Sequence, residues 1–562
     1  MKRTATNRRI GLLAAAFLIL LAATLARAVW LQVIKGPEYA AMAVRQHRET
    51  VVVPAGRGTI VDRTGEPLAI GRSTTTIYAN PRQVDDARDL TLSVAKIFGA
   101  DPAEVYPTLT DRSRGFVYIA RKADPRKAEK LEKLGYAGLG FYPEELRFYP
   151  QGPVGAQILG YAGLDNKGLE GLERSLEGTL AGQPGSQTIV KDPFGRALDV
   201  VETKQETPGK DVRLTIDRQI QANAEEVLAE TVRRWSARSA TAVVMDPQTG
   251  AILAMATAPR FNANRFSTTR ADRRRNRGVT DTYEPGSTFK LVPVAAALQE
   301  GIVNARSSFR LPPTLKVADR TIRESHSRGT QRMTVREIVE YSSNIGTVTI
   351  AQRLGEGRLA SWVDRFGFGK TTGVDFPGES AGFALPLEQW SGSTIGTVPI
   401  GHGIAVTPIQ MARAYSVIAN GGLLVKPRLI DRIGGESVGG RAARRIISRD
   451  VAGQMLSMLR GVVVEGTGTS AAIPGYTVAG KTGTAAKIDP DGTYSTSRYV
   501  ASFAGLVPAS KPKLVVMVMV DEPRGGYYGG MVAAPAFREI ARFNLQHLEI
   551  PQDSVVRKSG DR

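Results

Sequence analysis

Three short motifs occur in a fixed order along the chain and restrict its fold more than any other feature. They are S-x-x-K at residues 287–290, S-x-N at residues 342–344, and K-T-G-T at residues 481–484. Side chains three residues apart share one face of a helix, so the first motif predicts a helix. The glycine of the third motif suits a strand that another backbone approaches closely. The fold must therefore bring a helix, a loop and a strand together from distant parts of the chain.

The order of the motifs is more informative than any one of them. S-x-x-K is weak alone, because it also occurs at residues 93–96, in a polar amphipathic stretch, and at residues 510–513, where a proline disfavours a helix. Only Ser287 is followed by S-x-N and then by K-T-G, each of which occurs once. The similar string at residues 370–373 has an additional threonine, and we interpret it as a turn. The ordered set indicates serine acyl-transfer chemistry.

Ser287 and Lys290 are the expected nucleophile and base. A serine hydroxyl is a poor nucleophile until a base removes its proton. Pro285 and Gly286 place Ser287 at or near a helix N-terminus, where the helix dipole disfavours a protonated lysine. Burial would lower the pKa of Lys290 further, so this side chain can act as a neutral base near physiological pH.

Ser342 and Asn344 are expected in a loop or turn between two helices. A second hydroxyl near Ser287 can relay a proton from Lys290 to the leaving amine. The amide of Asn344 carries a donor and an acceptor, and therefore suits a substrate peptide group. The alternative interpretation is that Ser342 and Asn344 only cap the following helix, although capping and catalysis are compatible.

The K-T-G-T segment is expected to bind substrate along a strand. Lys481 supplies charge, and Thr482 and Thr484 supply hydroxyls for a carboxylate. Gly483 lets the strand approach the helix that carries Ser287, because it has no side chain in the way. The backbone N–H groups of Ser287 and Thr484 are expected to form an oxyanion hole. Losing one such donor typically costs ~10²–10³ in rate.

The composition excludes most other catalytic chemistries. The chain contains no cysteine, which removes thiol nucleophiles, cysteine-ligated zinc and disulfides. Its four histidines are scattered and none lies in H-E-x-x-H, so we expect no metal site and no cofactor. No G-x-S-x-G surrounds a suitable serine, which argues against a Ser-His-Asp triad. His402 lies between two glycines, and we interpret it as part of a tight turn.

The chain is strongly basic, with a net charge of +20. A basic chain can indicate nucleic-acid binding, but the lysines and arginines are dispersed and no nucleic-acid-binding signature is present. We therefore expect no nucleic-acid partner. A basic ectodomain that faces anionic lipid headgroups and an anionic cell wall explains the charge better.

The N-terminus predicts a single membrane anchor. Residues 1–9 contain four basic side chains and form the expected cytoplasmic tail, and residues 10–34 are apolar except for Arg27 near one end. Spanning a bilayer takes ~20 residues, and Arg27 can snorkel to the interface, where Trp30 also suits the depth. Positive-inside logic places everything after residue 35 outside the cytoplasm. The alternative is a cleaved signal peptide, because residues 26–28 resemble a small-x-small site.

A polar stretch at residues 202–210 divides the remaining chain into residues 36–205 and 211–550, followed by a flexible tail at residues 551–562. The second part predicts a helix at 217–235 capped by Asp217, and a closing helix at 536–548. It also predicts a hairpin of residues 242–246 and 251–255, and strands at 499–506 and 514–520. A sheet interrupted by a large helical insertion predicts the α+β fold class.

On these residues the chain resembles the class B penicillin-binding proteins, which are monofunctional peptidoglycan D,D-transpeptidases. The strings that carry the resemblance lie at residues 57–65, 147–150, 168–173, 284–287 and 478–485. The resemblance implies a transmembrane helix, a mixed α/β pedestal or dimerisation-like domain at 36–205, and a penicillin-binding transpeptidase domain at 211–550. That domain is expected to be serine β-lactamase-like, with an antiparallel sheet flanked by helices.

The resemblance also implies a reaction and an inhibitor class. Ser287 would be acylated by the penultimate D-alanine of a peptidoglycan stem peptide, with release of the terminal D-alanine. The amine of a neighbouring strand would then attack the acyl-enzyme and complete the cross-link. β-Lactam antibiotics would acylate the same serine.

Within the family, the short tail, the overall length and the pedestal strings resemble the division-specific branch more than the elongation branch. This implies septal cell-wall synthesis with a polytopic SEDS-type glycosyltransferase and other divisome membrane proteins. The implied location is the bacterial inner membrane, crossed once, with a cytoplasmic N-terminus and a periplasmic catalytic domain. The chain has no Glu-Asp dipeptide, which argues against the glycosyltransferase activity of bifunctional relatives.

Several other functions remain as alternatives. An elongation-type transpeptidase or a D,D-carboxypeptidase would use the same motifs. A β-lactamase shares them too, but its class A form needs an E-x-x-L-N motif that this chain lacks. A non-catalytic β-lactam sensor or scaffold belongs to a different functional class, and the complete set of motifs argues against it.

Overall fold

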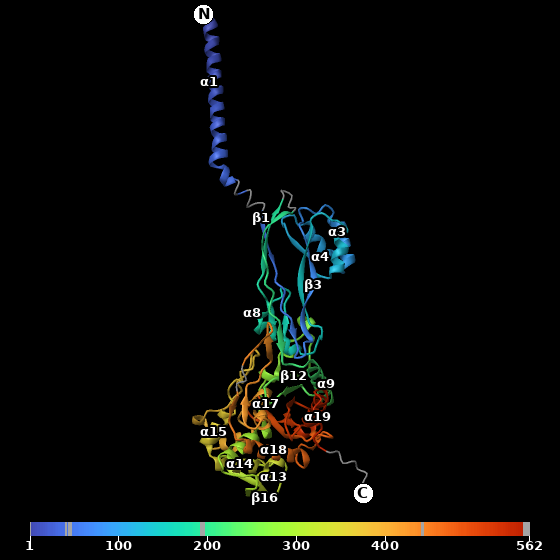
Figure 1. The fold of residues 1–562 in the computed structure, drawn as a ribbon, viewed down its shortest axis with the longest axis vertical. Helices are drawn as coiled ribbons and strands as arrows, with labels where there is room; N and C mark the ends of the chain where they lie inside the picture. The colour runs from blue at the N-terminus through green and yellow to red at the C-terminus, as the bar shows by residue number, and fades with distance from the viewer. Residues whose placement is uncertain (1, 40–41, 43–47, 192–196, 440–442, 555–562) are drawn as a thin grey trace. The chain divides into compact units, whose positions relative to one another are not determined.

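The computed structural model describes residues 2–39, 42, 48–191, 197–439 and 443–554 (Figure 1). Most of the tail predicted at 551–562 therefore lies outside the described residues. The chain forms two compact units, Met1–Gly56 with Gly182–Gly209, and Arg57–Ala181 with Lys210–Arg562.

The first unit contains an apolar N-terminal helix and a small sheet. Helix α1 (Lys2–Val29) continues into a π-helical turn, η1 (Trp30–Ile34). Residues Asn7–Ile34 are long and apolar enough to cross a membrane, with a mean hydropathy of 2.3, and are the only such span in the described part of the chain. The Arg27 guanidinium lies 4.8 Å from the centre of the Trp30 ring. The helix is consistent with a single-pass membrane anchor.

The small sheet of the first unit is antiparallel, with strand order β1-β8-β9. Its strands are β1 (Arg48–Val53), β8 (Gly185–Lys191) and β9 (Ala197–Lys204).

The second unit opens with a seven-stranded mixed sheet built from two distant parts of the chain. Its order is β19-β18-β10-β2-β3-β4, with β5 also paired to β3. The strands are β2 (Ile60–Val61), β3 (Pro67–Ala79), β4 (Val117–Ala123), β5 (Leu139–Phe148), β10 (Val212–Leu214), β18 (Ile430–Ile433) and β19 (Glu436–Ser437). Helices α3 (Ala87–Phe98) and α5 (Pro125–Glu132) bury Leu90, Val94 and Leu131 against β3 and β4.

A buried ionic cluster connects three of the strings on which the family resemblance rests. Glu173 is fully buried in α7 (Gly171–Ser175), and its two carboxylate oxygens accept hydrogen bonds from Arg57 Nε at 2.7 Å and Arg147 Nε at 2.6 Å. Arg57 Nη1 also donates to Glu177 at 2.9 Å. A buried carboxylate is tolerated when it is paired and hydrogen-bonded in this way. The strings at 57–65, 147–150 and 168–173 therefore meet at one carboxylate.

The part of the second unit that carries the three motifs is called the catalytic part. It is centred on a five-stranded antiparallel sheet of order β12-β11-β23-β22-β21. Its strands are β11 (Ser239–Met245), β12 (Ile252–Ala258), β21 (Ala479–Ile488), β22 (Tyr494–Val507) and β23 (Leu514–Asp521). Val516 and Val518 face one hydrophobic cluster and Met517 and Met519 the other, because side chains alternate along a strand. Helices α9 (Arg218–Arg234) and α19 (Gly529–His547) cover the first face (Figure 1).

The second face of this sheet is covered by α17 (Pro408–Ala419) and α18 (Arg449–Val464). Four further helices pack on these two or on one another: α12 (Leu291–Gln299), α13 (Val335–Glu340), α14 (Asn344–Leu354) and α15 (Glu356–Arg365). This arrangement confirms the predicted α+β fold with an antiparallel sheet flanked by helices.

The shorter elements complete the described chain. They are α4 (Pro102–Thr110), α6 (Ala156–Leu159), β6 (Tyr161–Ala162), β7 (Gly168–Glu170), α8 (Glu177–Leu180), η2 (Ala263–Thr268), α10 (Ala271–Arg274), α11 (Arg277–Thr280), η3 (Gly286–Lys290), β13 (Ser308–Leu311), β14 (Thr314–Val317), β15 (Arg320–Arg323), β16 (Gln331–Thr334), η4 (Leu387–Gln389), α16 (Thr394–Thr397), η5 (Val398–Ile400), β17 (Leu423–Val425), β20 (Ala443–Arg445) and η6 (Thr469–Ala471).

Most predicted elements of the catalytic part are confirmed, with one correction. Asp217 caps α9 by accepting from the N–H groups of Gln219 and Ile220, and β11 and β12 form the predicted hairpin. The closing helix, however, begins at Gly529 rather than at residue 536. The sequence obscured this start because the first turns contain two glycines and Pro535, which are poor helix formers.

Replacing Glu173 with alanine is predicted to destabilise the second unit, because it leaves the buried Arg147 guanidinium without its counterion and Arg57 paired with Glu177 alone. Removing one partner of a buried pair costs about 3–5 kcal/mol. The melting temperature of the full-length protein, followed by circular dichroism, should fall by several degrees. The control Glu129→Ala removes only an exposed pair with Lys133 and should leave the melting temperature unchanged. A wild-type melting temperature for Glu173→Ala would contradict this role.

Candidate active site

Ser287 lies in a 3₁₀ turn, η3, that leads directly into α12. The turn starts at Gly286, whose φ of 54° is in the left-handed region that glycine adopts readily. A Cβ atom at Gly286 would lie 2.7 Å from the carbonyl oxygen of Thr484. The Gly286 N–H donates to the carbonyl of Gly401 at 3.2 Å. The turn at Gly286–Lys290, called the nucleophile turn after the role expected of Ser287, thus lies between β21 and the turn at Gly401.

Lys290 is buried, and its amine is held by the S-x-N segment. Nζ donates to the Ser342 carbonyl at 2.6 Å and to Asn344 Oδ1 at 2.7 Å, and it lies 3.2 Å from Ser342 Oγ. Burial, and then the neighbouring charge of Lys481, hold the pKa of Lys290 well below its ordinary value, and Glu324 opposes this shift. A lysine in this setting can carry an unprotonated amine near neutral pH.

The S-x-N segment forms a sharp turn before α14. Ser342 has a φ of 58°, a left-handed conformation that is uncommon for a residue with a side chain. Ser343 is the N-cap of α14, with its hydroxyl accepting from Gly346 N at 2.9 Å. Ser343 therefore caps α14, while the side chains of Ser342 and Asn344 lie against Lys290.

Glu324 contacts the S-x-N turn, although the motifs did not indicate it. Its carboxylate follows β15 and accepts hydrogen bonds from the Ser343 hydroxyl and from the backbone N–H of Asn344, the latter at 2.8 Å. The Asn344 side-chain amide donates to the Arg323 carbonyl at 2.9 Å. A carboxylate is favourable at this helix N-terminus. The hairpin of β14 and β15 thus fixes the turn that holds Lys290.

Strand β21 places the K-T-G-T residues beside the nucleophile turn. A Cβ atom at Gly483 would lie 2.8 Å from the Pro285 carbonyl oxygen and 2.9 Å from Thr288 Cγ2, so only glycine allows this approach. The expectation that Gly483 brings the strand close to Ser287 is confirmed. The Thr484 hydroxyl accepts from Gly529 N at 3.0 Å, which ties the first turn of α19 to the same strand.

Lys481 is more enclosed than a substrate-binding cation would be expected to be. It is 1 % exposed, and its Nζ lies 3.3 Å from the Thr482 carbonyl oxygen. Burial lowers the pKa of Lys481 to about 7. Thr482 Oγ1 lies 2.7 Å from Thr467 Oγ1, a residue after α18 that the motifs did not indicate. Lys481 is therefore a buried lysine of β21 whose amine lies against Thr482.

The Ser287 hydroxyl has no hydrogen-bond partner within the described residues, and Lys290 Nζ is directed to the S-x-N segment instead. Catalytic hydrogen bonds often tighten only when substrate binds, so this geometry is compatible with proton transfer between them. The structure brings all the motif residues of the sequence analysis to one place.

Other residues that support the nucleophile turn escaped the sequence analysis. The Glu284 carboxylate accepts from Gly403 N at 2.8 Å and lies 2.8 Å from His402 Nδ1, and Tyr415 donates to the Thr288 carbonyl at 2.8 Å. Gly401 and Gly403 have φ of 80° and 71°, which confirms the tight turn predicted around His402. Only the position of Glu284 beside the S-x-x-K motif could have signalled its role.

The fold and this site match known protein families. The model described as Penicillin binding protein transpeptidase domain matches residues 240–542, and that described as Penicillin-binding Protein dimerisation domain matches residues 52–214. The chain belongs to the class B penicillin-binding proteins. The resemblance identified from the motifs is thereby confirmed, and the penicillin-binding protein is a serine-type peptidoglycan D,D-transpeptidase.

Named relatives match the penicillin-binding protein over nearly its whole length. Peptidoglycan D,D-transpeptidase FtsI of Escherichia coli is 34% identical, over 99% of this chain and 94% of the relative. Stage V sporulation protein D of Bacillus subtilis is also 34% identical, over 94% of this chain and 84% of the relative. Penicillin binding protein 3 from Mycobacterium tuberculosis, solved with aztreonam, is 30% identical with a TM-score of 0.71, covering 90% of this chain and 98% of that chain.

Replacing Gly483 with alanine is predicted to separate β21 from the nucleophile turn, because the new Cβ would collide with the backbone at Pro285. A misplacement of about 1 Å at a reacting group can cost ~10² in rate. The rate of acylation by a fluorescent penicillin should therefore fall by roughly 10²-fold. Gly453→Ala in α18 is the matched control, since nothing lies within 4 Å of its added Cβ. Equal rates in the two variants would contradict the close approach.

Proposed function

We propose that Ser287 is the nucleophile of this transpeptidase and Lys290 its general base. The observation that carries the proposal is the buried Lys290 amine, held by Ser342 and Asn344 with a lowered pKa. The two N–H bonds of a neutral amine can serve the Ser342 carbonyl and Asn344 Oδ1. Its lone pair is then left for the Ser287 proton or the Ser342 hydroxyl. A neutral base beside an otherwise unactivated serine is what acyl transfer needs.

In the proposed reaction, Ser287 Oγ attacks the carbonyl carbon of the penultimate D-alanine of a stem peptide while Lys290 takes its proton. The oxyanion is stabilised by the N–H groups of Ser287 and Thr484. Ser342 relays the proton to the leaving terminal D-alanine, whose carboxylate binds Lys481, Thr482 and Thr484. An amine of a stem peptide on a neighbouring peptidoglycan strand then attacks the acyl-enzyme, which forms the cross-link and restores the Ser287 hydroxyl. The same steps up to the acyl-enzyme apply to a β-lactam ring.

We propose the domain assignment of the sequence analysis for the full chain, together with its orientation in the membrane. The basic tail at 1–9 lies in the cytoplasm, the anchor at 10–34 crosses the bacterial inner membrane once, and the pedestal at 36–205 and the catalytic part at 211–550 lie in the periplasm. The four basic residues before the apolar helix support this orientation.

We further propose that the enzyme works in septal cell-wall synthesis, with a SEDS-type glycosyltransferase and other divisome membrane proteins. The full-length similarity to FtsI supports this role. Stage V sporulation protein D has the same identity, so identity alone does not distinguish the branches. The short tail and the pedestal strings favour the division branch over the elongation branch.

The nucleophile is tested by the mass of the full-length protein after incubation with benzylpenicillin. Ser287→Ala should abolish the covalent adduct, whereas Ser93→Ala, in the unrelated S-x-x-K string of α3, should retain it. A peptide map should place the wild-type adduct on the segment that contains Ser287. An adduct on Ser287→Ala would overturn the assignment. Hydrolysed drug without an adduct would instead indicate a β-lactamase.

The septal role is tested by depleting the protein in its own bacterium and labelling new wall with a fluorescent D-amino acid. Septal incorporation should be lost while lateral incorporation continues. Loss of lateral incorporation with normal septa would favour the elongation-type alternative. In the depleted cells, the full-length wild-type gene and the Ser287→Ala variant are expressed at equal levels. The comparison tests whether septal wall synthesis needs the acyl-transfer step.

A further inference from the structure

A strongly basic surface lies on two small antiparallel sheets between α12 and α13. Strands β13 and β16 pair with each other and enclose the pair β14 and β15, and we call residues 308–334 the basic ribbon. The ribbon contains six lysine and arginine residues and two carboxylates. All of its cations except the half-buried Arg328 are exposed, namely Arg310, Lys316, Arg320, Arg323 and Arg332.

The register of β13 and β16 places two arginines directly opposite each other. Arg310 pairs with Arg332, and both side chains are exposed. Neither forms an ion pair with any residue that the structure describes, and Arg332 donates only to the Ser308 hydroxyl, at 3.0 Å. Like charges directly opposite each other destabilise an antiparallel pair. An arrangement that costs stability in this way is expected at a functional surface, here one that meets an anion.

The carboxylates on and beside the ribbon do not neutralise it. Glu324 is turned inward and accepts hydrogen bonds from the S-x-N turn. On the adjoining α13, Glu337 is held in the capping box and Glu340 pairs with Arg336 at 3.4 Å. Asp319, on the turn between β14 and β15, is the one exposed carboxylate of the ribbon. Positive charge is therefore in large excess on the outer surface of the ribbon.

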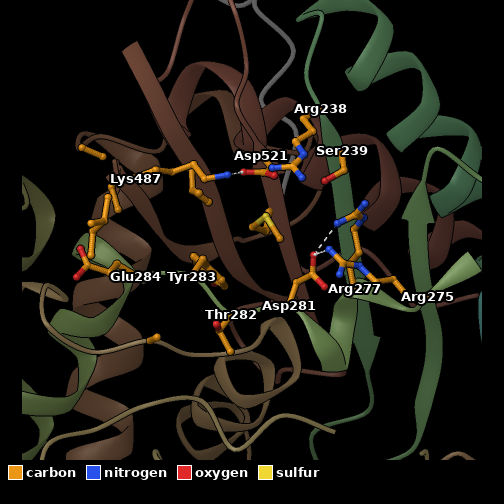
Figure 2. Close-up of a pocket in the computed structure, with 16 residues that line it drawn as sticks. Arg238, Ser239, Arg275, Arg277, Asp281, Thr282, Tyr283, Glu284, Lys487 and Asp521 are labelled. Atoms are coloured by element: carbon orange, nitrogen blue, oxygen red, sulfur yellow. Dashed lines mark hydrogen bonds and ion pairs between the residues drawn. The ribbon is translucent and has the colours of Figure 1, made fainter. Parts of the chain in front are cut away.

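Other cations near the nucleophile turn have carboxylate partners. In the cavity that Figure 2 shows, Asp281 accepts hydrogen bonds from Arg275 at 2.9 Å and Arg277 at 2.6 Å. Lys487 pairs there with Asp521 at 2.8 Å (Figure 2). None of the six cations of the ribbon forms an ion pair with any of the described residues. The unpaired charge is thus a property of the ribbon and not of every basic surface around the active site.

The ribbon borders the active site on two sides. The Asn344 amide donates to the Arg323 carbonyl at 2.9 Å, so β15 contacts the S-x-N turn. The His326 ring lies 5.5 Å from the ring of Tyr528, the N-cap residue of α19. The first turn of α19 is itself tied to Thr484. An anionic polymer bound on the ribbon would therefore be held next to the site of acyl transfer.

We propose that the basic ribbon binds uncross-linked peptidoglycan through the carboxylates of its stem peptides, outside the acyl-transfer site. Stem peptides repeat along a glycan strand, so several carboxylates can pair with several guanidinium groups at once. The same charge attracts the polymer over a longer range and raises the rate of encounter. The proposal rests on the peptidoglycan substrate of the proposed function, but the ribbon needs neither Ser287 nor Lys290 for binding.

The probe is a fluorescently labelled, soluble glycan strand that carries its stem peptides. The control is the same strand after an amidase has removed the peptides. The full-length protein in detergent is first treated with benzylpenicillin, which occupies the acyl-transfer site, and binding is then followed by fluorescence anisotropy. The intact strand should bind saturably, and more weakly as the salt concentration rises. The peptide-free strand should bind at least roughly tenfold more weakly.

Arg332→Glu separates the charge of the ribbon from its folding. The new carboxylate lies opposite Arg310, so attraction replaces repulsion and the melting temperature should be unchanged or higher. The affinity for the intact strand should fall roughly tenfold or more, because a positive charge becomes a negative one. Acylation by benzylpenicillin should keep its wild-type rate, since Arg332 contacts Ser308 rather than the motif residues.

Arg88→Glu is the matched control, because it makes the same change of charge at an exposed arginine of α3 and should leave the affinity unchanged. Wild-type affinity in Arg332→Glu, an equal loss in Arg88→Glu, or equal binding of the peptide-free strand would overturn the proposal. Tighter binding of poly-glutamate than of the strand would assign the surface to an acidic protein, and would overturn it as well. A failure of the acylation mechanism is seen separately, as wild-type protein that forms no benzylpenicillin adduct but still binds the strand.

Discussion

The hydrogen bonds between the Lys290 amine and the turn at residues 342–344 are the interaction on which the rest of the site depends. The amine is buried, so it must either be desolvated at high cost or lose its proton. The Ser342 carbonyl and Asn344 Oδ1 accept its two short hydrogen bonds, and Glu324 fixes the backbone of that turn from the neighbouring hairpin. The base is thus positioned by a segment far from it in sequence, and its protonation is set by burial and by Lys481.

Close backbone contacts at glycines provide the second constraint. Gly286, Gly483 and Gly529 each lie where a Cβ would collide with the backbone of another element. Together they stack the nucleophile turn, β21 and the start of α19 directly on one another. The oxyanion-hole geometry proposed for Ser287 and Thr484 requires this spacing, because both donors belong to backbones that meet only where side chains are absent.

The sequence predicted the parts of this protein whose determinants are local. The α9 cap at Asp217, the β11–β12 hairpin and the strand at Leu514–Asp521 follow from capping, turn and hydrophobic patterns. The motif order located the residues at 287–290, 342–344 and 481–484, which the structure brings together. The sequence did not reveal Glu324, Tyr415 or the start of α19. Their positions depend on tertiary contacts. In α19, Gly529 packs against Gly483 and Ser502 and Gly530 packs against Thr467, so packing rather than helix propensity favours glycine there. The capping alternative for Ser342 and Asn344 likewise needed the structure, which assigns the cap to Ser343.

The central claim, that Lys290 acts as a buried neutral base, is tested most directly by the pH dependence of the acylation rate of the full-length protein with benzylpenicillin. The rate should fall in acid as Lys290 becomes protonated, with the midpoint well below the ordinary lysine pKa of 10.5. Arg328 lowers the pKa of Lys290, so Arg328→Gln should move that midpoint to higher pH, whereas Arg332→Gln on β16 should not. A midpoint near 10.5, or one unmoved by Arg328→Gln, would contradict the account.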